Sequence, residues 1–198
     1  MIKIGLTGSI GMGKSTTASM FKEAGAYVFG ADAAVHKLYA KNGAAVPLLR
    51  AVFPDIIVDG AVDRTKLLAH LKSDPLNIEV LESFIHPMVV SLREEAIKLA
   101  KASGAKIFVA DIPLLFETGA QAYFDIIVVA SAKSSVQRQR VLSRPGMTKE
   151  KYALILSRQL PDAQKRTKAD YVVKTDKGMD FARNQVNTIV RTLGPVDN

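Results

Sequence analysis

The sequence begins with a phosphate-loop pattern, G-x-x-x-x-G-K-[ST], which Gly-Ser-Ile-Gly-Met-Gly-Lys-Ser at residues 8–15 matches at every fixed position. The apolar run 2–7 before it predicts a buried strand, and residues 14–24, closed by Gly25, predict a helix. A strand, a glycine-rich loop and a helix form the setting in which this pattern binds a polyphosphate, because the loop amides lie at the positive end of the helix. The motif therefore predicts nucleotide binding.

The motif also assigns chemistry to its side chains. Lys14 would reach the β- and γ-phosphates, and the Ser15 hydroxyl would hold Mg²⁺. The residues expected to bind the nucleotide are Gly8, Gly11, Met12, Gly13, Lys14, Ser15 and Thr16. ATP and Mg²⁺ are the expected cofactors.

Strand and helix patterns alternate along the chain. Short apolar runs predict strands, and because these runs do not alternate with polar residues, both faces of the sheet should be covered by helices. Ser134 is expected to cap a helix, and Gly104 and Gly194 are expected to end two others. The predicted strands are 2–7, 27–29, 106–112, 125–130 and 171–174, and the predicted helices begin at Lys14, Ala33, Ile78, Ser134, Lys149 and Met179. This order predicts a three-layer α/β fold with a central parallel sheet of five strands and the phosphate loop on a central strand.

Residues 33–105 carry no strong strand signal and are too many for a simple crossover. Apolar residues at helical spacing run from Ile78 to Leu99, through the His86-Pro87 pair. The segment is therefore predicted to be a helical insertion, and by analogy with other inserted lobes it is expected to bind the second substrate.

The positive charge is concentrated in one segment. Residues 131–168 contain ten Lys or Arg and two acidic residues, a net charge of +8, which equals the net charge of the whole chain. In a phosphate-loop protein the expected partner is the triphosphate, and arginines on a closing lid over residues 138–168 would contact it. A solvated basic surface is the alternative for most of these residues.

Composition excludes several classes of protein. The chain has no cysteine, which rules out disulfides, thiolate metal sites and thiol catalysis. Neither a membrane-length apolar run nor a signal peptide is seen, so no membrane partner is expected and the cytoplasm is the expected compartment. The sequence does not set an oligomeric state.

Several stretches together resemble the dephospho-CoA kinases. They include Ile4–Thr16, Ala31-Asp32, Val62-Asp63-Arg64, Ser73-Asp74-Pro75, Ile85-His86-Pro87, Asp111-Ile112-Pro113-Leu114-Leu115-Phe116-Glu117, the arginines at 138, 140 and 144, and Ala169-Asp170. They occur in the family's order over nearly the whole chain. The chain departs from the family at Gly30, where Asp or Asn is frequent, and at Thr175, where Asn is frequent near the adenine.

The resemblance implies ATP-dependent phosphorylation of the ribose 3′-hydroxyl of dephospho-CoA, giving CoA and ADP. Dephospho-CoA is then the expected partner, and nucleic acid is not. Asp32 is expected to orient the acceptor hydroxyl and take its proton, since it follows a strand expected to lie beside the phosphate-loop strand. Its alternative role is the N-cap of the next helix. Asp111 would hold Mg²⁺ through water, or orient the acceptor alongside Asp32.

The remaining candidates are arginines, a glutamate and a histidine. Arg140 and Arg144, four residues apart on one helical face before Pro145-Gly146, are expected to clamp the phosphates. Arg64, His86 and Glu117 are candidates for binding substrate, although His86 could instead fix the start of a helix and Glu117 could contact nothing. His36 and His70 are predicted to be surface residues.

Two other functions are compatible with the motif. A nucleoside or nucleotide monophosphate kinase shares the fold and the chemistry but would accept a substrate without the pantetheine arm. A non-catalytic nucleotide-dependent switch or nucleic-acid binder would bind ATP without turnover and would show salt-dependent binding to DNA or RNA. The absence of an N-K-x-D motif argues against a GTPase.

Overall fold

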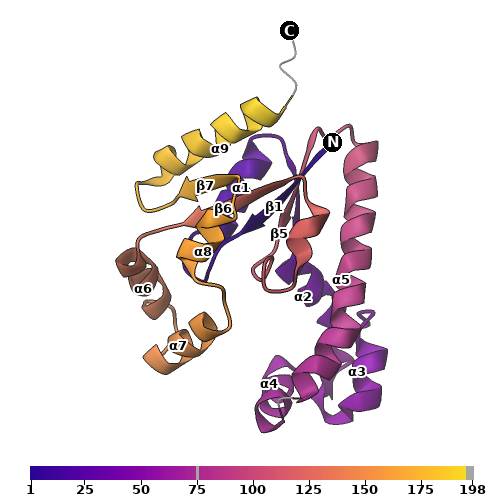
Figure 1. The fold of residues 1–198 in the computed structure, drawn as a ribbon. Helices are drawn as coiled ribbons and strands as arrows, with labels where there is room; N and C mark the ends of the chain where they lie inside the picture. Colours follow the sequence, from indigo (N-terminus) through magenta and orange to yellow (C-terminus); the bar gives the residue numbers. More distant parts are fainter. Residues whose placement is uncertain (75, 195–198) are drawn as a thin grey trace. The chain divides into compact units, whose positions relative to one another are not determined.

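The computed structural model describes residues 1–74 and 76–194 (Figure 1). Two compact units make up the chain. The first, the core unit, consists of Met1–Phe29 and Ile97–Asn198, and the second, the inserted unit, consists of Gly30–Ala96. The inserted unit covers most of the predicted insertion 33–105, and the long helix α5 (Leu76–Ala102) continues from it into the core unit.

A five-stranded parallel sheet forms the centre of the core unit, in the order β2-β5-β1-β6-β7. Its strands are β1 (Ile2–Thr7), β2 (Tyr27–Gly30), β5 (Ile107–Asp111), β6 (Ile126–Ser131) and β7 (Tyr171–Lys174). All five lie within one residue of the predicted ranges at each end, and the phosphate-loop strand β1 is central as predicted. One prediction is wrong: β2 lies beside β5 and not beside β1, because β5 takes the place next to the phosphate-loop strand.

Buried aliphatic residues cover both faces of this sheet. On one face, helices α1 (Lys14–Glu23) and α9 (Met179–Leu193) contact each other and pack on strand residues such as Ile4, Val109 and Val128. On the other face, Leu115 and its neighbours in the loop after β5 pack on Ile127 and Val129. Uninterrupted apolar strands are what burial on both faces requires. Among the residues described, no helix combines the length and the apolar character needed to cross a membrane.

The remaining α-helices of the core unit lie within the basic segment 131–168. They are α6 (Ser134–Leu142), α7 (Lys149–Ser157) and α8 (Asp162–Thr167), and the short 3₁₀ helix η2 (Ala120–Tyr123) follows β5. The prediction that Ser134 caps α6 is wrong, because Lys133 takes the N-cap position and no side chain caps that end. In α7 the cap is Thr148, whose hydroxyl accepts a hydrogen bond from the Lys151 amide.

The inserted unit contains more than helices. Its elements are α2 (Ala31–Tyr39), α3 (Val46–Val52), η1 (Pro54–Ile56), β3 (Ile57–Val58), β4 (Ala61–Val62), α4 (Arg64–Ser73) and most of α5. Strands β3 and β4 form an antiparallel hairpin, which corrects the prediction of a purely helical segment. Asp59 and Gly60 in its two-residue turn both have positive φ, which Asp-Gly adopts readily. The Asp-Gly pair is a sequence signal for a hairpin turn, but the two strands are too short to show an apolar pattern in the sequence.

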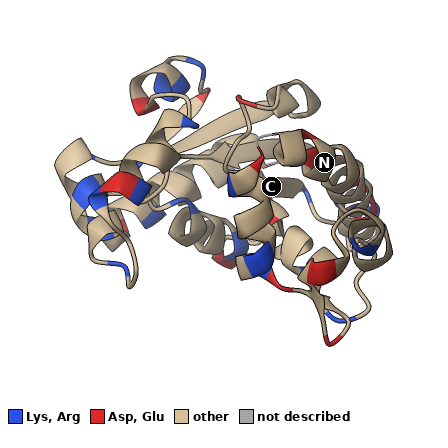
Figure 2. Ribbon diagram, turned by 90° about the horizontal axis from the view of Figure 1, so that it is seen from below, with Lys and Arg blue, Asp and Glu red and all other residues tan. Residues whose placement is uncertain are grey.

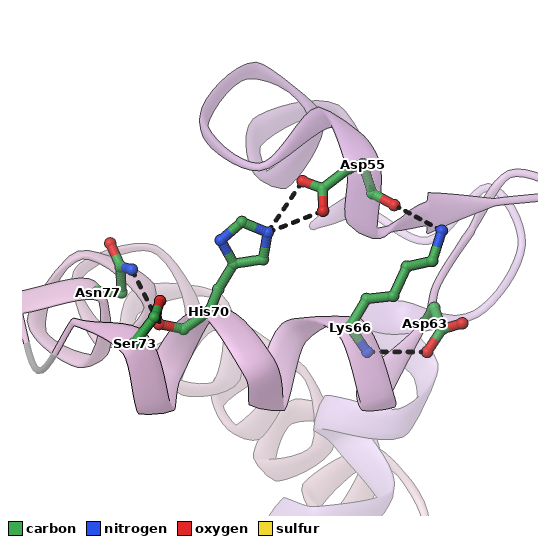
Figure 3. Close-up of polar contacts among 6 residues, drawn as sticks. All are labelled: Asp55, Asp63, Lys66, His70, Ser73 and Asn77. Carbon is green, nitrogen blue, oxygen red and sulfur yellow. Dashed lines mark hydrogen bonds and ion pairs between the residues drawn. The ribbon is translucent and has the colours of Figure 1, made fainter.

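Polar contacts fasten η1 to α4 within this unit (Figure 3). The His70 ring donates from Nε2 to both carboxylate oxygens of Asp55, at 3.0 and 2.9 Å, and Lys66 Nζ donates to the Asp55 carbonyl. The hydrogen bond from His70 holds the pKa of the Asp55 carboxyl below its ordinary value. His70, predicted to be a surface residue, therefore forms a local hydrogen-bonded pair with Asp55.

Candidate functional site

The phosphate loop connects β1 to α1, and its glycines occupy positions where a side chain would clash with neighbouring atoms. Gly11 and Gly13 have φ of 76° and 87°, in the left-handed region that favours glycine. A Cβ would lie 2.5 Å from Val141 Cγ2 at Gly11, 2.9 Å from Thr175 Oγ1 at Gly13 and 2.6 Å from the Ala130 carbonyl oxygen at Gly8. The loop is thus packed closely against α6, the end of β6 and the residue after β7.

The amino terminus of α1 has the features of an anion site. Lys14 is its first residue, Gly13 is its N-cap, and no side chain caps the helix. The amides of its first turn therefore need another acceptor, and the helix dipole favours a negative one. The Ser15 and Thr16 side chains are exposed at this end. The residues here fit a triphosphate, which supports the nucleotide role predicted for residues 8–16.

Lys14 is paired with Asp111 at the carboxyl edge of the sheet. Lys14 Nζ lies 2.5 Å from Asp111 Oδ1, and the two side chains are 12% and 14% exposed. Asp111 is the last residue of β5, opposite Leu6 of β1 in the parallel register, so the topology itself brings it next to the phosphate loop. Asp111 is therefore the acidic residue at the end of a strand adjacent to β1. The sequence alone predicts Asp32 at this position.

Arg140 binds the loop after β7. Its guanidinium donates to the Thr175 hydroxyl at 2.9 Å, to the Thr175 carbonyl at 2.7 Å and to the Gly11 carbonyl at 3.4 Å. The Thr175 hydroxyl in turn donates to the Met12 carbonyl at 2.8 Å. Arg140 thus ties two segments to the phosphate loop.

Arg144 lies elsewhere. Helix α6 ends at Leu142, so the expectation that Arg140 and Arg144 share one helical face is wrong. Arg144 is exposed in the turn before Gly146, whose φ is 72°.

Glu117 belongs to a polar cluster that anchors the connection between α7 and α8. Its Oε1 lies 2.9 Å from the ammonium of Lys165, which is fully buried, and it accepts a 2.7 Å hydrogen bond from the Leu160 amide. Lys165 also donates to the Pro113 carbonyl, which accepts a hydrogen bond from Thr7 just before the phosphate loop. Arg166 likewise pairs with Asp162. Part of the basic segment therefore stabilises the fold through ion pairs with acidic residues, and Figure 2 shows the positions of both kinds of charged residue on the ribbon.

Two glutamines contact the phosphate loop, and sequence reasoning missed both. Gln137 on α6 donates to the Ile10 carbonyl, and Gln159, after α7, accepts from the Ile10 amide. No motif marks them, because a glutamine on a helical segment has the same pattern whether it meets water or a distant loop.

The inserted unit holds the remaining candidates. Asp32 is exposed in the first turn of α2, and since Gly30 is the N-cap, the alternative of Asp32 as N-cap is wrong. Asp32, His36 and Tyr39 follow at helical spacing on α2. Arg64 donates to His36 Nδ1 at 3.0 Å, and its Cζ lies 5.8 Å from the centre of the Tyr39 ring. His36 is exposed, as predicted, and is also a partner of Arg64.

The Arg64 contact also fixes chemistry at its two neighbours. An arginine can only donate, so Nδ1 of His36 accepts and is unprotonated in this arrangement. Burial raises the pKa of the Tyr39 phenol, and the Arg64 charge opposes that rise.

His86 is exposed in the middle of α5. The alternative in which His86 fixes the start of a helix is therefore wrong.

A cavity of about 810 Å³ lies at the amino-terminal ends of the strands, on the opposite side of the sheet from the phosphate loop. It is lined by the carboxyl ends of α1, α5 and α9 and by the first residues of β2 and β5, including Tyr27 and Ile107. Helix carboxyl ends carry partial negative charge, and ligands of open α/β sheets bind at the carboxyl ends of the strands. This cavity therefore does not suit a triphosphate.

Comparison with known proteins identifies the family of this chain. The family model described as dephospho-CoA kinase matches residues 2–180. The dephospho-CoA kinase of Mesorhizobium japonicum is 50% identical over 193 residues, which cover 98% of this chain and 97% of that one. The crystal structure of a Thermus thermophilus protein matches with a TM-score of 0.82 at 30% identity, covering 97% of both chains.

A more distant structure shares the fold. The dephospho-CoA kinase from Campylobacter jejuni matches with a TM-score of 0.66 at 20% identity, over 97% of each chain. The family model and the full-length relative extend the likeness from the fold to the sequence of nearly the whole chain. The chain therefore belongs to the dephospho-CoA kinase family, the phosphate-loop kinases of the final step of coenzyme A biosynthesis.

Proposed function

We propose that this protein transfers the γ-phosphoryl group of ATP to the ribose 3′-hydroxyl of dephospho-CoA, giving CoA and ADP. The observation that carries the proposal is the uncapped amino terminus of α1 behind a phosphate loop, in a chain that matches dephospho-CoA kinases along its length. Phosphoryl transfer requires mainly that the two oxygens be held in line and that the spreading charge be stabilised.

On the donor side, the loop amides and Lys14 take the triphosphate. Lys14 pairs with Asp111 in the structure, and the β- and γ-phosphates are proposed to take the place of that carboxylate as its partner. A Mg²⁺ ion held by the Ser15 hydroxyl and the phosphate oxygens would neutralise charge on the transferring group. Asp111, beside this position, then acts on the donor side and could hold a metal-bound water.

On the acceptor side, Asp32 orients the hydroxyl and takes its proton. Its exposure and the lack of an N-cap role leave its carboxylate accessible to a ligand. His36 lies one turn beyond Asp32 on α2 and holds the side chain of Arg64, the first residue of α4. Arg64 is thereby placed to bind a phosphate group of the acceptor. His86 stays a candidate of the same unit. The inserted unit as a whole is proposed to bind dephospho-CoA.

The lid is proposed to be shorter than the segment 138–168. Arg140 and Lys165 are fastened to the core, so the movable part lies between them, in residues 143–158. Within it Arg144 is the candidate for clamping the transferring phosphoryl group. Arg140 is proposed to shape the nucleotide site, and Glu117 to anchor the lid without touching substrate.

Asp32→Asn tests the acceptor chemistry. We expect kcat with dephospho-CoA to fall by ~10² or more, while the Kd for Mg-ATP and the melting temperature stay near those of the wild type. Asp63→Asn is a matched control, since Asp63 caps α4 through two backbone amides and its loss should lower stability more than kcat. Unchanged turnover in Asp32→Asn would remove this residue from the mechanism.

A further inference from the structure

Ile10 lies in the middle of the phosphate loop, and glutamine side chains from outside the loop bind both of its backbone polar groups. Gln137 Nε2 donates to the Ile10 carbonyl at 2.9 Å, and the Ile10 amide donates to Gln159 Oε1 at 3.0 Å. The two glutamines are 127 and 149 residues away from Ile10 in the sequence. Neither group of Ile10 therefore depends on water or nucleotide for a partner.

Both glutamines are themselves held in place. Gln137 is buried on α6, at 5% exposure, in the same helix as Val141, which packs against Gly11. Gln159 is half-buried, and the next residue, Leu160, donates its amide to Glu117, the partner of the fully buried Lys165. The two side chains come from either end of the proposed lid, residues 143–158. They reach Ile10 from two separately anchored segments.

This arrangement has a physical consequence for nucleotide binding. A loop rich in glycine has many conformations, and ordering it during binding would cost affinity. Fixing both backbone groups of one central residue restricts the loop before the nucleotide arrives. The uncapped amides at the start of α1 can then face the phosphates without competing for those two partners.

We propose that Gln137 and Gln159 are positioning residues that hold the phosphate loop in its nucleotide-binding conformation through Ile10. The inference rests on the proposed function only in that the loop binds the triphosphate of ATP. It does not depend on which acceptor is phosphorylated.

A pair of Gln→Glu substitutions separates the hydrogen bonds from the added charge. Gln159→Glu keeps an acceptor for the Ile10 amide, whereas Gln137→Glu removes the donor and sets a carboxylate against the Ile10 carbonyl. Both add one negative charge beside the loop. Gln139→Glu, at an exposed position of α6, adds the same charge away from Ile10 and is the matched control.

The measurement is the Kd of Mg-ATP for each full-length variant, by calorimetric titration without acceptor, together with the melting temperature. We expect ~10-fold or greater weakening for Gln137→Glu, less than ~3-fold for Gln159→Glu and no change for Gln139→Glu. In turnover assays the KM for ATP should rise with kcat nearly constant. Equal weakening in Gln137→Glu and Gln159→Glu would show a charge effect only and would overturn the proposal.

Further variants cover a failure to fold and a purely structural role. Gln137→Met and Gln159→Met remove the hydrogen bonds without adding charge, and each should weaken ATP binding ~3- to 10-fold. If Gln137→Glu does not fold, Gln159→Met carries the test. A lower melting temperature with an unchanged Kd would mean that the glutamines stabilise the fold without positioning the loop. If the wild type binds ATP but does not phosphorylate dephospho-CoA, the proposed function fails and this inference stands.

Discussion

The ion pair between Lys14 and Asp111 leads to a prediction that links stability to nucleotide binding. Asp111→Asn keeps the shape of the side chain and an amide oxygen that can accept from Lys14, but removes the negative charge. Lys14 then stays a nearly buried cation without a charged partner. We expect the variant to be less stable than the wild type in the absence of ATP.

The structure sets the size of this effect. Removing one partner of a fully buried ion pair costs about 3–5 kcal/mol, and exposed pairs are worth about 0–1 kcal/mol. The two side chains are 12% and 14% exposed, close to the buried limit, but the asparagine still accepts a hydrogen bond, so we expect a loss of about 1–3 kcal/mol. For a protein of this size, that loss lowers the melting temperature by roughly 2–12 °C.

Nucleotide should reverse most of this loss. A triphosphate supplies the negative charge that Asp111→Asn lacks, so ATP added with EDTA should raise the melting temperature of the variant more than that of the wild type. EDTA removes metal binding from the comparison. Lys14→Met is the control, because without the ammonium group the rise with ATP should be small. Equal rises with ATP in the wild type and in Asp111→Asn would refute the exchange of partners on Lys14.

Three further predictions concern other contacts. Lys165→Met leaves Glu117, whose side chain is 17% exposed, without its buried cation and should lower the free energy of unfolding by about 1–3 kcal/mol in denaturant titration, with less loss in the Lys165→Met/Glu117→Leu double variant. Because the hydrogen bond from His70 lowers the pKa of Asp55, that pair stabilises the fold above pH 3.8 and the contribution disappears as pH falls below it, so Asp55→Asn should show a flatter pH dependence of stability there. Arg144→Ala should lower kcat by about 10-fold or more with little change in melting temperature, as steady-state kinetics and thermal unfolding would show.

The strands and the phosphate loop could be predicted because each has a local cause. Strands β1 and β7 lie on the predicted residues, because a short unbroken apolar run is typical of a strand that is covered by other elements on both faces of the sheet. The hairpin of β3 and β4 could not be predicted from its strands, which have two residues each, and only the Asp59-Gly60 turn signalled it.

Sheet order and long-range contacts could not be predicted from local patterns. Nothing in residues 27–30 shows that β5 separates them from β1, and this error led the sequence analysis to favour Asp32 for a position beside the phosphate loop that Asp111 occupies. The pairing of Glu117 with Lys165 and the contacts of Ile10 join residues at least 48 positions apart. Only the folded chain brings such side chains together. The roles of Asp32, Arg64 and Arg144 stay predictions for mutagenesis.

Phosphorylation of dephospho-CoA by this protein with ATP can be measured directly as ADP release by the purified protein. The assay compares Mg-ATP alone with Mg-ATP plus dephospho-CoA, AMP, CMP or adenosine, and identifies products by mass. We expect rapid ADP release only with dephospho-CoA, with CoA as the product. Rapid turnover with AMP, CMP or adenosine and none with dephospho-CoA would contradict the proposed function, and would leave only the donor half of the site standing.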